Sequence, residues 1–262
     1  MSFFQQGHFG VLRQLTRREV RLKYQGTMLG RGWIFILPLL LLSLFTFVFS
    51  EIFHMHWPNQ TKDSPLYFSV FMFVGLTLHQ TVSEVLSRAP SVFVSQASLV
   101  TKVVFPLWVL PVSMALGALY HFLLSLLVYL ALLASLGFLS IHWLILPVVL
   151  FPFLLACCSL SLLFASLGVF LRDLGPIIGL FVTGLMFLTP IFYPLSSVSG
   201  KVEFWLGLNP MTPLVESFRA ILFSTHWPSW ANLIYIWLTS LGLLLFSVWV
   251  YRRLKTGFAD VL

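Results

Sequence analysis

The residues of this chain that could perform chemistry do not form a reactive site. His54 and His56 are two residues apart, so they do not share a helical face as a pair of metal ligands would. The phosphate-binding pattern G-x-x-x-x-G-K-[ST] is incomplete, because Leu195 and Val202 replace its first glycine and its hydroxyl around Gly200-Lys201. We therefore expect no catalytic residue, no metal site and no cofactor within this chain.

Composition indicates that lipid surrounds most of the chain. Of its 262 residues, 59% are hydrophobic and 9% are charged, whereas a soluble domain is about half apolar and about a quarter charged. A soluble fold cannot hide so much apolar surface, because burial is limited by surface-to-volume scaling. The adjacent Cys157 and Cys158 lie in an apolar run and are interpreted as small core residues, not as a disulfide framework. A basic nucleic-acid-binding domain is disfavoured, since its cations would cluster on a soluble face.

Six apolar stretches are long enough to cross a bilayer as helices. They are continuous rather than alternating, which favours helices over strands, and a helix satisfies its own backbone hydrogen bonds in lipid. The predicted fold is an all-α membrane protein with six transmembrane helices, an N-terminal amphipathic interfacial helix, and short outer-face helices before the last span. The predicted spans are residues 32–53, 66–84, 106–136, 143–170, 174–195 and 231–251.

The basic residues predict the orientation through the positive-inside rule. The chain has 15 lysines and arginines. If the N-terminus is in the cytoplasm, only three of them fall in segments outside the membrane on the opposite side, namely Lys62, Lys201 and Arg219. Both termini are then cytoplasmic, in agreement with an even number of spans. We divide the chain into a cytoplasmic interfacial segment, residues 1–31, and a six-span domain with a short cytoplasmic tail, residues 32–262.

Two further segments modify this simple pattern. Residues 9–24 would place apolar side chains on one helical arc and arginines on the opposite one, which is typical of a helix lying in the membrane interface. An ordinary basic flank without a fixed helix is the alternative. The two arcs consist of Val11, Leu12, Leu15 and Leu22, and of Arg13, Arg17, Arg18 and Arg21. Residues 196–230 are too polar to span but rich in aromatic residues, so short helices at the outer interface are expected there.

Ionisable residues lie at the membrane edges rather than at mid-span. Glu84 and Arg88 are four residues apart at the end of the second span and could pair. An almost empty midplane disfavours a proton- or sodium-coupled carrier, and no loop gathers the acids or histidines that a membrane-embedded glycosyltransferase would need. The energy source must then be another subunit or a gradient of the cargo itself.

Six groups of residues follow one another along the chain in an order typical of one family. They are Arg21, Lys23, Tyr24, Leu29, Gly30, Trp33 and Pro38; Leu99-Val100, Lys102 and Phe105-Pro106; Phe170-Leu171-Arg172-Asp173; Thr189-Pro190-Ile191-Phe192-Tyr193-Pro194; Asn209-Pro210 with Phe218-Arg219-Ala220; and Gly257-Phe258-Ala259-Asp260-Val261-Leu262. This order resembles the permease subunits of type-2 ABC exporters for O-antigen, capsular polysaccharide and teichoic acid, the Wzm-like group. The resemblance covers essentially the whole chain.

The resemblance implies a non-enzymatic subunit in the bacterial inner membrane. Two copies would form a channel for a lipid-linked polysaccharide, and two separate ATPase subunits would bind ATP and Mg on the cytoplasmic side. The N-terminal helix and the loop after the second span, acting as a coupling helix, would contact the ATPase. The expected contact residues are Gln96, Leu99, Val100, Lys102, Phe105, Arg17 and Arg21. An exporter of teichoic acid, of a drug or of a small lipid stays open as an alternative.

Aromatic residues, 16% of the chain, suggest a glycan pathway because sugars bind aromatic faces by apolar contact. Packing against protein or lipid is the alternative interpretation. The channel-lining candidates are Trp33, Phe45, Phe49, Phe187, Phe192 and Tyr193.

Overall fold

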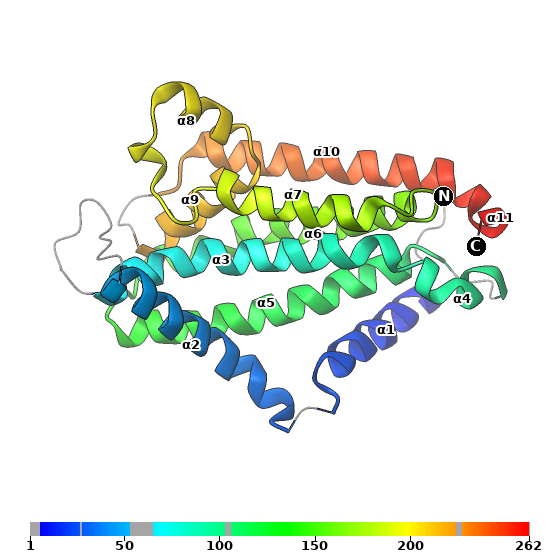
Figure 1. Ribbon diagram of the computed structural model, residues 1–262, viewed down its shortest axis with the longest axis horizontal. Coiled ribbons are helices and arrows are strands. Elements are labelled where there is room, and N and C mark those ends of the chain that lie inside the picture. The colour runs from blue at the N-terminus through cyan, green and yellow to red at the C-terminus, as the bar shows by residue number, and fades with distance from the viewer. Residues whose placement is uncertain (1–5, 27, 53–64, 103–105, 224–226, 262) are drawn as a thin grey trace.

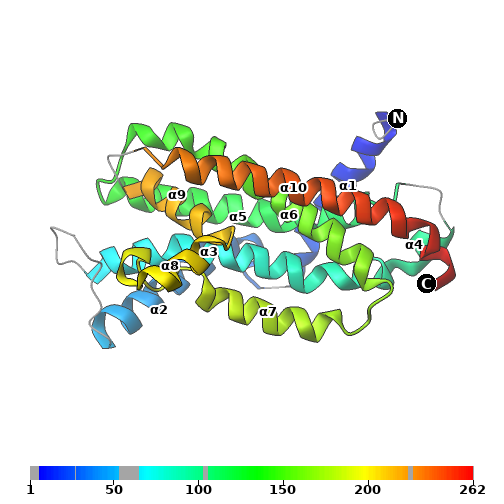
Figure 2. The same cartoon turned by 90° about the horizontal axis from the view of Figure 1, so that it is seen from above.

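The computed structural model describes residues 6–26, 28–52, 65–102, 106–223 and 227–261 (Figure 1). Within these residues every regular element is helical and no strand occurs. The long helices run along the longest axis of the molecule (Figures 1 and 2). The prediction of an all-α chain is therefore confirmed.

The helices of the described residues follow the order of the predicted apolar stretches, with short elements between them. Their bounds are α1 Gln6–Tyr24, η1 Gly30–Gly32, α2 Trp33–Thr46, η2 Phe47–Ile52, α3 Pro65–Arg88, η3 Ala89–Ser91, η4 Val94–Gln96, α4 Ala97–Lys102, α5 Val109–Ser135, η5 Ile141–Ile145, α6 Leu146–Gly168, α7 Leu174–Leu188, η6 Leu195–Ser197, α8 Gly200–Gly207, α9 Met211–Phe223, α10 Trp230–Leu254, η7 Lys255–Gly257 and α11 Phe258–Val261.

Four helical stretches among the described residues are long and apolar enough to cross a membrane. They are Phe68–Ser91, Val109–Ser135, Ile141–Gly168 and Trp230–Gly257. Two shorter apolar helices cover Phe35–Phe49 and Leu174–Leu188. All six overlap the apolar stretches identified in the sequence, as expected for a multi-pass membrane protein.

The short helices gather at the two ends of the bundle, and we name each end after one of them. The α4 end holds η3, η4, α4, η7 and α11, and the α8 end holds η2, η6, α8 and α9 (Figure 1). Both α4 and α11 lie at the end where the chain finishes.

The α6–α10 pair shows how this chain tolerates proline inside a helix. α6 and α10 form the most extensive helix–helix contact in the described molecule. Pro152 lies inside α6 and has no N–H to donate to the carbonyl of Val148, four residues earlier. The indole Nε1 of Trp237 on α10 donates to that carbonyl at 3.1 Å. The neighbouring helix thus replaces the missing bond, which is the solution expected in lipid.

Polar side chains in the bundle interior also bond to backbone carbonyls of other helices. Ser161 on α6 donates to the Pro111 carbonyl of α5 at 2.7 Å, and the Tyr129 hydroxyl of α5 donates to the Val70 carbonyl of α3. His79 Nε2 on α3 lies 3.0 Å from the Val182 carbonyl of α7. Because an unpaired polar group is costly in an apolar interior, these bonds fix how the helices are aligned.

Helix α1 packs against α5. Gly117 of α5 makes this possible, because a Cβ at that position would lie only 3.0 Å from the Cβ of Glu19. Leu15 of the predicted apolar arc packs against a buried cluster, but Leu22 is 51% exposed. Lys23, the next residue, reaches Glu84 on α3, and adjacent helical positions point in different directions. Leu22 therefore turns away from the bundle.

Candidate functional site

At the α8 end, helix α7 stops inside an apolar environment and leaves carbonyl groups without helical partners. Thr189 is extended, with φ −108° and ψ 137°, as favoured for a residue that precedes proline. Asn209 Nδ2 donates to the Leu188 carbonyl at 3.1 Å and to Thr189 Oγ1 at 3.0 Å. Asn209 Oδ1 accepts from the backbone N–H of Met211 at the start of α9 at 3.0 Å. One side chain thereby joins the end of α7 to the beginning of α9.

Arg219 of α9 completes this connection. Its Nη1 donates to the Pro190 carbonyl at 2.6 Å and its Nη2 to the Ile191 carbonyl at 2.8 Å. Its Nε donates to the Phe71 carbonyl of α3 at 3.2 Å. The Arg219 side chain is buried, and burial lowers its pKa while the carboxylate of Glu216, 3.0 Å away, opposes that shift. Arg219 therefore holds α3, α9 and the segment after α7 together.

We name the segment of residues 188–191 with Asn209 and Arg219 the carbonyl clamp. Ile191 within it is fully buried and packs over Gly75 of α3, where a Cβ would lie 3.3 Å from its side chain. Four oxygens of the segment are bonded by two side chains. The clamp fixes the end of α7 just before Phe192 and Tyr193, two of the predicted channel-lining aromatics.

Five of the predicted channel-lining aromatics meet beside the clamp. Phe49 stacks on Phe192 with ring centroids 5.7 Å apart and lies 6.2 Å from Phe45. Phe187 lies 6.5 Å from Phe192 and is 62% exposed. The Tyr193 hydroxyl donates to the Phe187 carbonyl at 3.0 Å. The structure thus brings these predicted residues together where η2 meets the end of α7.

Trp33 lies elsewhere. It begins α2 and lines a cavity shared with Lys23, Glu84 and His121, whose lining includes neither Phe49 nor Phe192. The six predicted channel residues therefore divide into a group of five at the α8 end and a single tryptophan on the opposite half of α2.

The predicted coupling loop contains two short helices, η4 and α4. Gln96 and Leu99 are partly buried. The side chains of Val100 and Lys102, and the whole of Phe105, lie outside the described residues. α4 packs against α11, and Phe93, just before η4, packs against Phe258 of α11 with ring centroids 5.1 Å apart. Helix α11 thus packs against the predicted coupling loop.

Arg17 and Arg21 are exposed on α1 and line a hollow together with Arg18. Figure 1 shows α1 and α4 toward the same end of the molecule. The structure leaves these two arginines accessible to a partner from outside the bundle.

An ionic network joins α1 to α3 near these elements. The predicted Glu84–Arg88 pair forms at 3.5 Å. Arg88 also reaches Glu19 at 2.5 Å, and Lys23 reaches Glu84 at 2.7 Å. Sequence reasoning found only the local pair, because the partners on α1 are more than sixty residues away in the chain.

Sequence reasoning also missed the roles of Asn209 and Arg219. Both belong to the segments that carry the family resemblance, but their spacing along the chain gives no indication that they bond to the end of α7. Among the described residues, no group of three or more histidine, cysteine, aspartate or glutamate side chains could hold a metal ion. The geometry is that of a helical bundle with buried hydrogen bonds to carbonyls at the α8 end and ion pairs toward the α4 end.

Comparison with known proteins agrees with this architecture. A family model described as ABC-2 type transporter matches residues 11–223. An O-antigen export system permease protein RfbA from Myxococcus xanthus is 31% identical over 254 residues, covering 96% of this chain and 95% of that protein. A protein of the same name from Klebsiella pneumoniae is 25% identical over 256 residues, with 97% and 95% covered. This multi-pass membrane chain belongs to the ABC-2 type transporter family.

Proposed function

We propose that this chain is the permease subunit of an ABC exporter that moves a lipid-linked O-antigen polysaccharide across the bacterial inner membrane. The observation that carries the proposal is the end-to-end similarity, at 31% identity, to a protein named as an O-antigen export permease. Two relatives from Klebsiella pneumoniae carry the same name. These names favour polysaccharide over a drug or a small lipid, and O-antigen over teichoic acid or capsule.

In this proposal the chain crosses the membrane six times, with both termini in the cytoplasm. The two shorter helices, α2 and α7, serve as spans together with the four long ones. Support comes from the arginines and lysines, which are concentrated on α1 and at the ends of α3, α6 and α10. The α4 end then faces the cytoplasm and the α8 end faces outward. Residues 1–31 form the interfacial segment and residues 32–262 the spanning domain.

The proposed partner at the cytoplasmic side is an ABC ATPase, which supplies ATP, Mg and hydrolysis. Its docking surface combines η4 and α4 with the exposed arginines of α1, Arg17 and Arg21. Support comes from the packing of α4 on α11 and of Phe93 on Phe258, because a helix that transmits force must be backed by a packed element. Gln96, Leu99, Val100, Lys102 and Phe105 are the proposed contacts.

The proposed pathway lies between two copies of the chain. α7 carries Ile177, Leu180 and Phe181 more than half exposed, so this face needs lipid or a second copy to cover it. The aromatics around Phe49 and Phe192 offer ring faces for passing sugars near the outer end. Trp33 would act at the inner end, apart from the others.

The decisive experiment is reconstitution with the candidate ATPase. The chain should copurify with an ABC ATPase subunit, and ATP hydrolysis by the complex should rise when lipid-linked O-antigen is added. Transport by the purified chain alone, without ATP or a companion protein, would contradict the proposal.

A charge introduced at the coupling loop tests the docking surface. We expect Leu99→Asp to reduce copurification of the ATPase, because it places a desolvated charge at the apolar contact. Leu139→Asp is the matched control, since Leu139 is 72% exposed in the loop between α5 and η5, at the opposite end. Equal ATPase recovery with both variants would remove α4 from the docking surface.

A further inference from the structure

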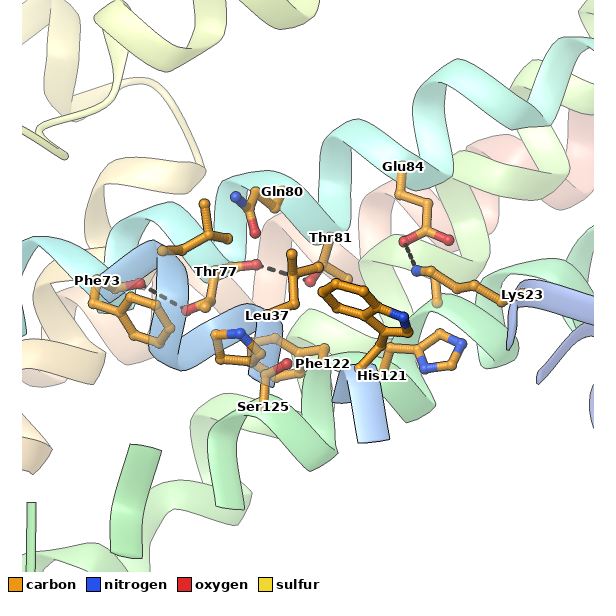
Figure 3. Close-up of a pocket in the computed structure, with 14 residues that line it drawn as sticks. Lys23, Leu37, Phe73, Thr77, Gln80, Thr81, Glu84, His121, Phe122 and Ser125 are labelled. Carbon is orange, nitrogen blue, oxygen red and sulfur yellow. Dashed lines mark hydrogen bonds and ion pairs between the residues drawn. The ribbon is translucent and has the colours of Figure 1, made fainter. Parts of the chain in front are cut away.

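A cavity of about 370 Å³ lies between α1, α2, α3 and α5, outside the carbonyl clamp and the coupling loop (Figure 3). The residues that line it change from apolar to charged along the bundle axis. On α3 the cavity is lined by Phe73, Thr77, Gln80, Thr81 and Glu84, at the three- and four-residue spacing that places side chains on one helical face. Figure 3 shows Phe73 at one end of the cavity and Glu84 at the other.

The opposite walls follow the same gradient. Lys23 lies at the Glu84 end, on the same side as the buried His121 of α5, and Trp33 at the start of α2 also lines the cavity. Leu41 and Phe122 add apolar side chains to the lining. An indole with a polar edge and an apolar body is favoured where one part of a site is wet and the other is in hydrocarbon. The cavity is therefore shaped for an amphiphile, with its polar end toward the membrane surface.

The ion pairs at the polar end allow Lys23 to accept a second anion. Glu84 contacts both Lys23, at 2.7 Å, and Arg88, at 3.5 Å. If Lys23 turns to a ligand, Arg88 still compensates the charge of Glu84. The side chain of Lys23 is 37% exposed, so it can move without breaking a buried contact.

Charge on α1 favours an anionic occupant. The described side chains of α1 include Arg13, Arg17, Arg18, Arg21 and Lys23, against the single carboxylate of Glu19. Basic residues beside a membrane attract anionic lipid headgroups, by about 1 kcal/mol for each cation near the surface.

We propose that this cavity binds one lipid with a phosphate headgroup, with the phosphate at Lys23 and Trp33 and the chain along Leu41, Phe73 and Phe122. A soluble anion would leave the apolar end unfilled. A plain hydrocarbon would remove water from the ion pair of Lys23 and Glu84 without bringing a polar group to it, which is unfavourable. The occupant is either a phospholipid of the bilayer or a polyprenyl phosphate, because both present the same headgroup chemistry.

Native mass spectrometry of the delipidated full-length chain tests this site. Phosphatidylglycerol, a polyprenyl phosphate and diacylglycerol are titrated separately. We expect the two phosphate lipids, or one of them, to bind at least ~10-fold more tightly than diacylglycerol, as estimated for one charge-assisted hydrogen bond. Preference for the polyprenyl phosphate identifies a carrier lipid as the occupant, and equal or better binding of phosphatidylglycerol identifies a bilayer lipid. Diacylglycerol binding as tightly as both would overturn the proposal.

Two variants locate the binding within the cavity. Lys23→Gln should weaken phosphate-lipid binding by roughly 10-fold, the effect of losing one charged donor, while Lys255→Gln, at an exposed lysine after α10, should change nothing. Ser125→Phe should fill the apolar end and weaken binding of every lipid. Ala118→Leu narrows the same cavity from the His121 side and replaces it if Ser125→Phe does not elute as a folded protein. If Lys23→Gln and the folded cavity-filling variant both bind the lipids as tightly as the wild-type chain, the proposal is wrong.

The test requires neither ATP nor the ATPase. A failure here leaves the exporter assignment intact, and a chain without an ATPase partner can still show the lipid site.

Discussion

At the α8 end, Arg219 and Asn209 donate to backbone carbonyls, and at the α4 end Lys23 and Arg88 pair with carboxylate side chains. Arg219 is 4% exposed, whereas the side chain of Arg88 is 44% exposed. Buried bonds to a charged group stabilise strongly because unpaired carbonyls are costly there. Exposed ion pairs contribute little and are screened by salt. The comparison indicates an α8 end held by buried hydrogen bonds and an α4 end whose charges can be rearranged.

The largest expected effect comes from breaking the carbonyl clamp. Arg219→Ala removes the donors to Phe71, Pro190 and Ile191 and should destabilise the fold by ~3–5 kcal/mol, the range for breaking a buried charged network. The measurement is the midpoint of thermal unfolding in detergent. Arg172→Ala is the control, because Arg172 is exposed. Similar midpoints for the two variants would mean that the clamp does not make the α8 end rigid.

A smaller effect is expected from a backbone contact at the α4 end. Gly168 of α6 approaches η3 so closely that a Cβ would lie 2.2 Å from the Pro90 carbonyl oxygen. Gly168→Ala must therefore move backbone and should cost ~1–3 kcal/mol, as overpacking does. Gly184→Ala on α7 meets open space and should leave the unfolding midpoint unchanged or slightly raised. Tolerance of both alanines would show that α6 and η3 are loosely packed.

The smallest expected effect comes from the ionic network. Arg88→Gln removes the contacts with Glu19 and Glu84, yet it should cost less than ~1 kcal/mol, because exposed ion pairs are weak. The loss should fade as salt is raised from low ionic strength. Arg13→Gln, at an exposed arginine of α1, serves as the reference. A large loss that persists in salt would make the α4 end as rigid as the α8 end.

The sequence predicted the fold class well because helical spans leave a local signal. Six apolar stretches and basic flanks can be identified residue by residue. The pair of Glu84 and Arg88 could be predicted for the same reason, since their spacing alone places them on one helical face.

Contacts between distant segments left no such signal. Nothing in the pattern connects Arg219 with Phe71, which is 148 residues away, or Trp237 with Val148, 89 residues away. The aromatic candidates illustrate the same point: the sequence selected Trp33 with Phe49 and Phe192, and the structure separates Trp33 from the other two.

The sequence by itself determined that lipid surrounds this chain, that it is helical, and where its apolar stretches lie, because these properties depend on hydrophobic length and composition. The tertiary structure decided which polar groups are bonded to each other, how α9 holds the end of α7, and where a cavity opens between α1, α2, α3 and α5. In an apolar interior a polar group must find a partner wherever packing provides one, and packing between distant helices is set only when the whole chain has folded.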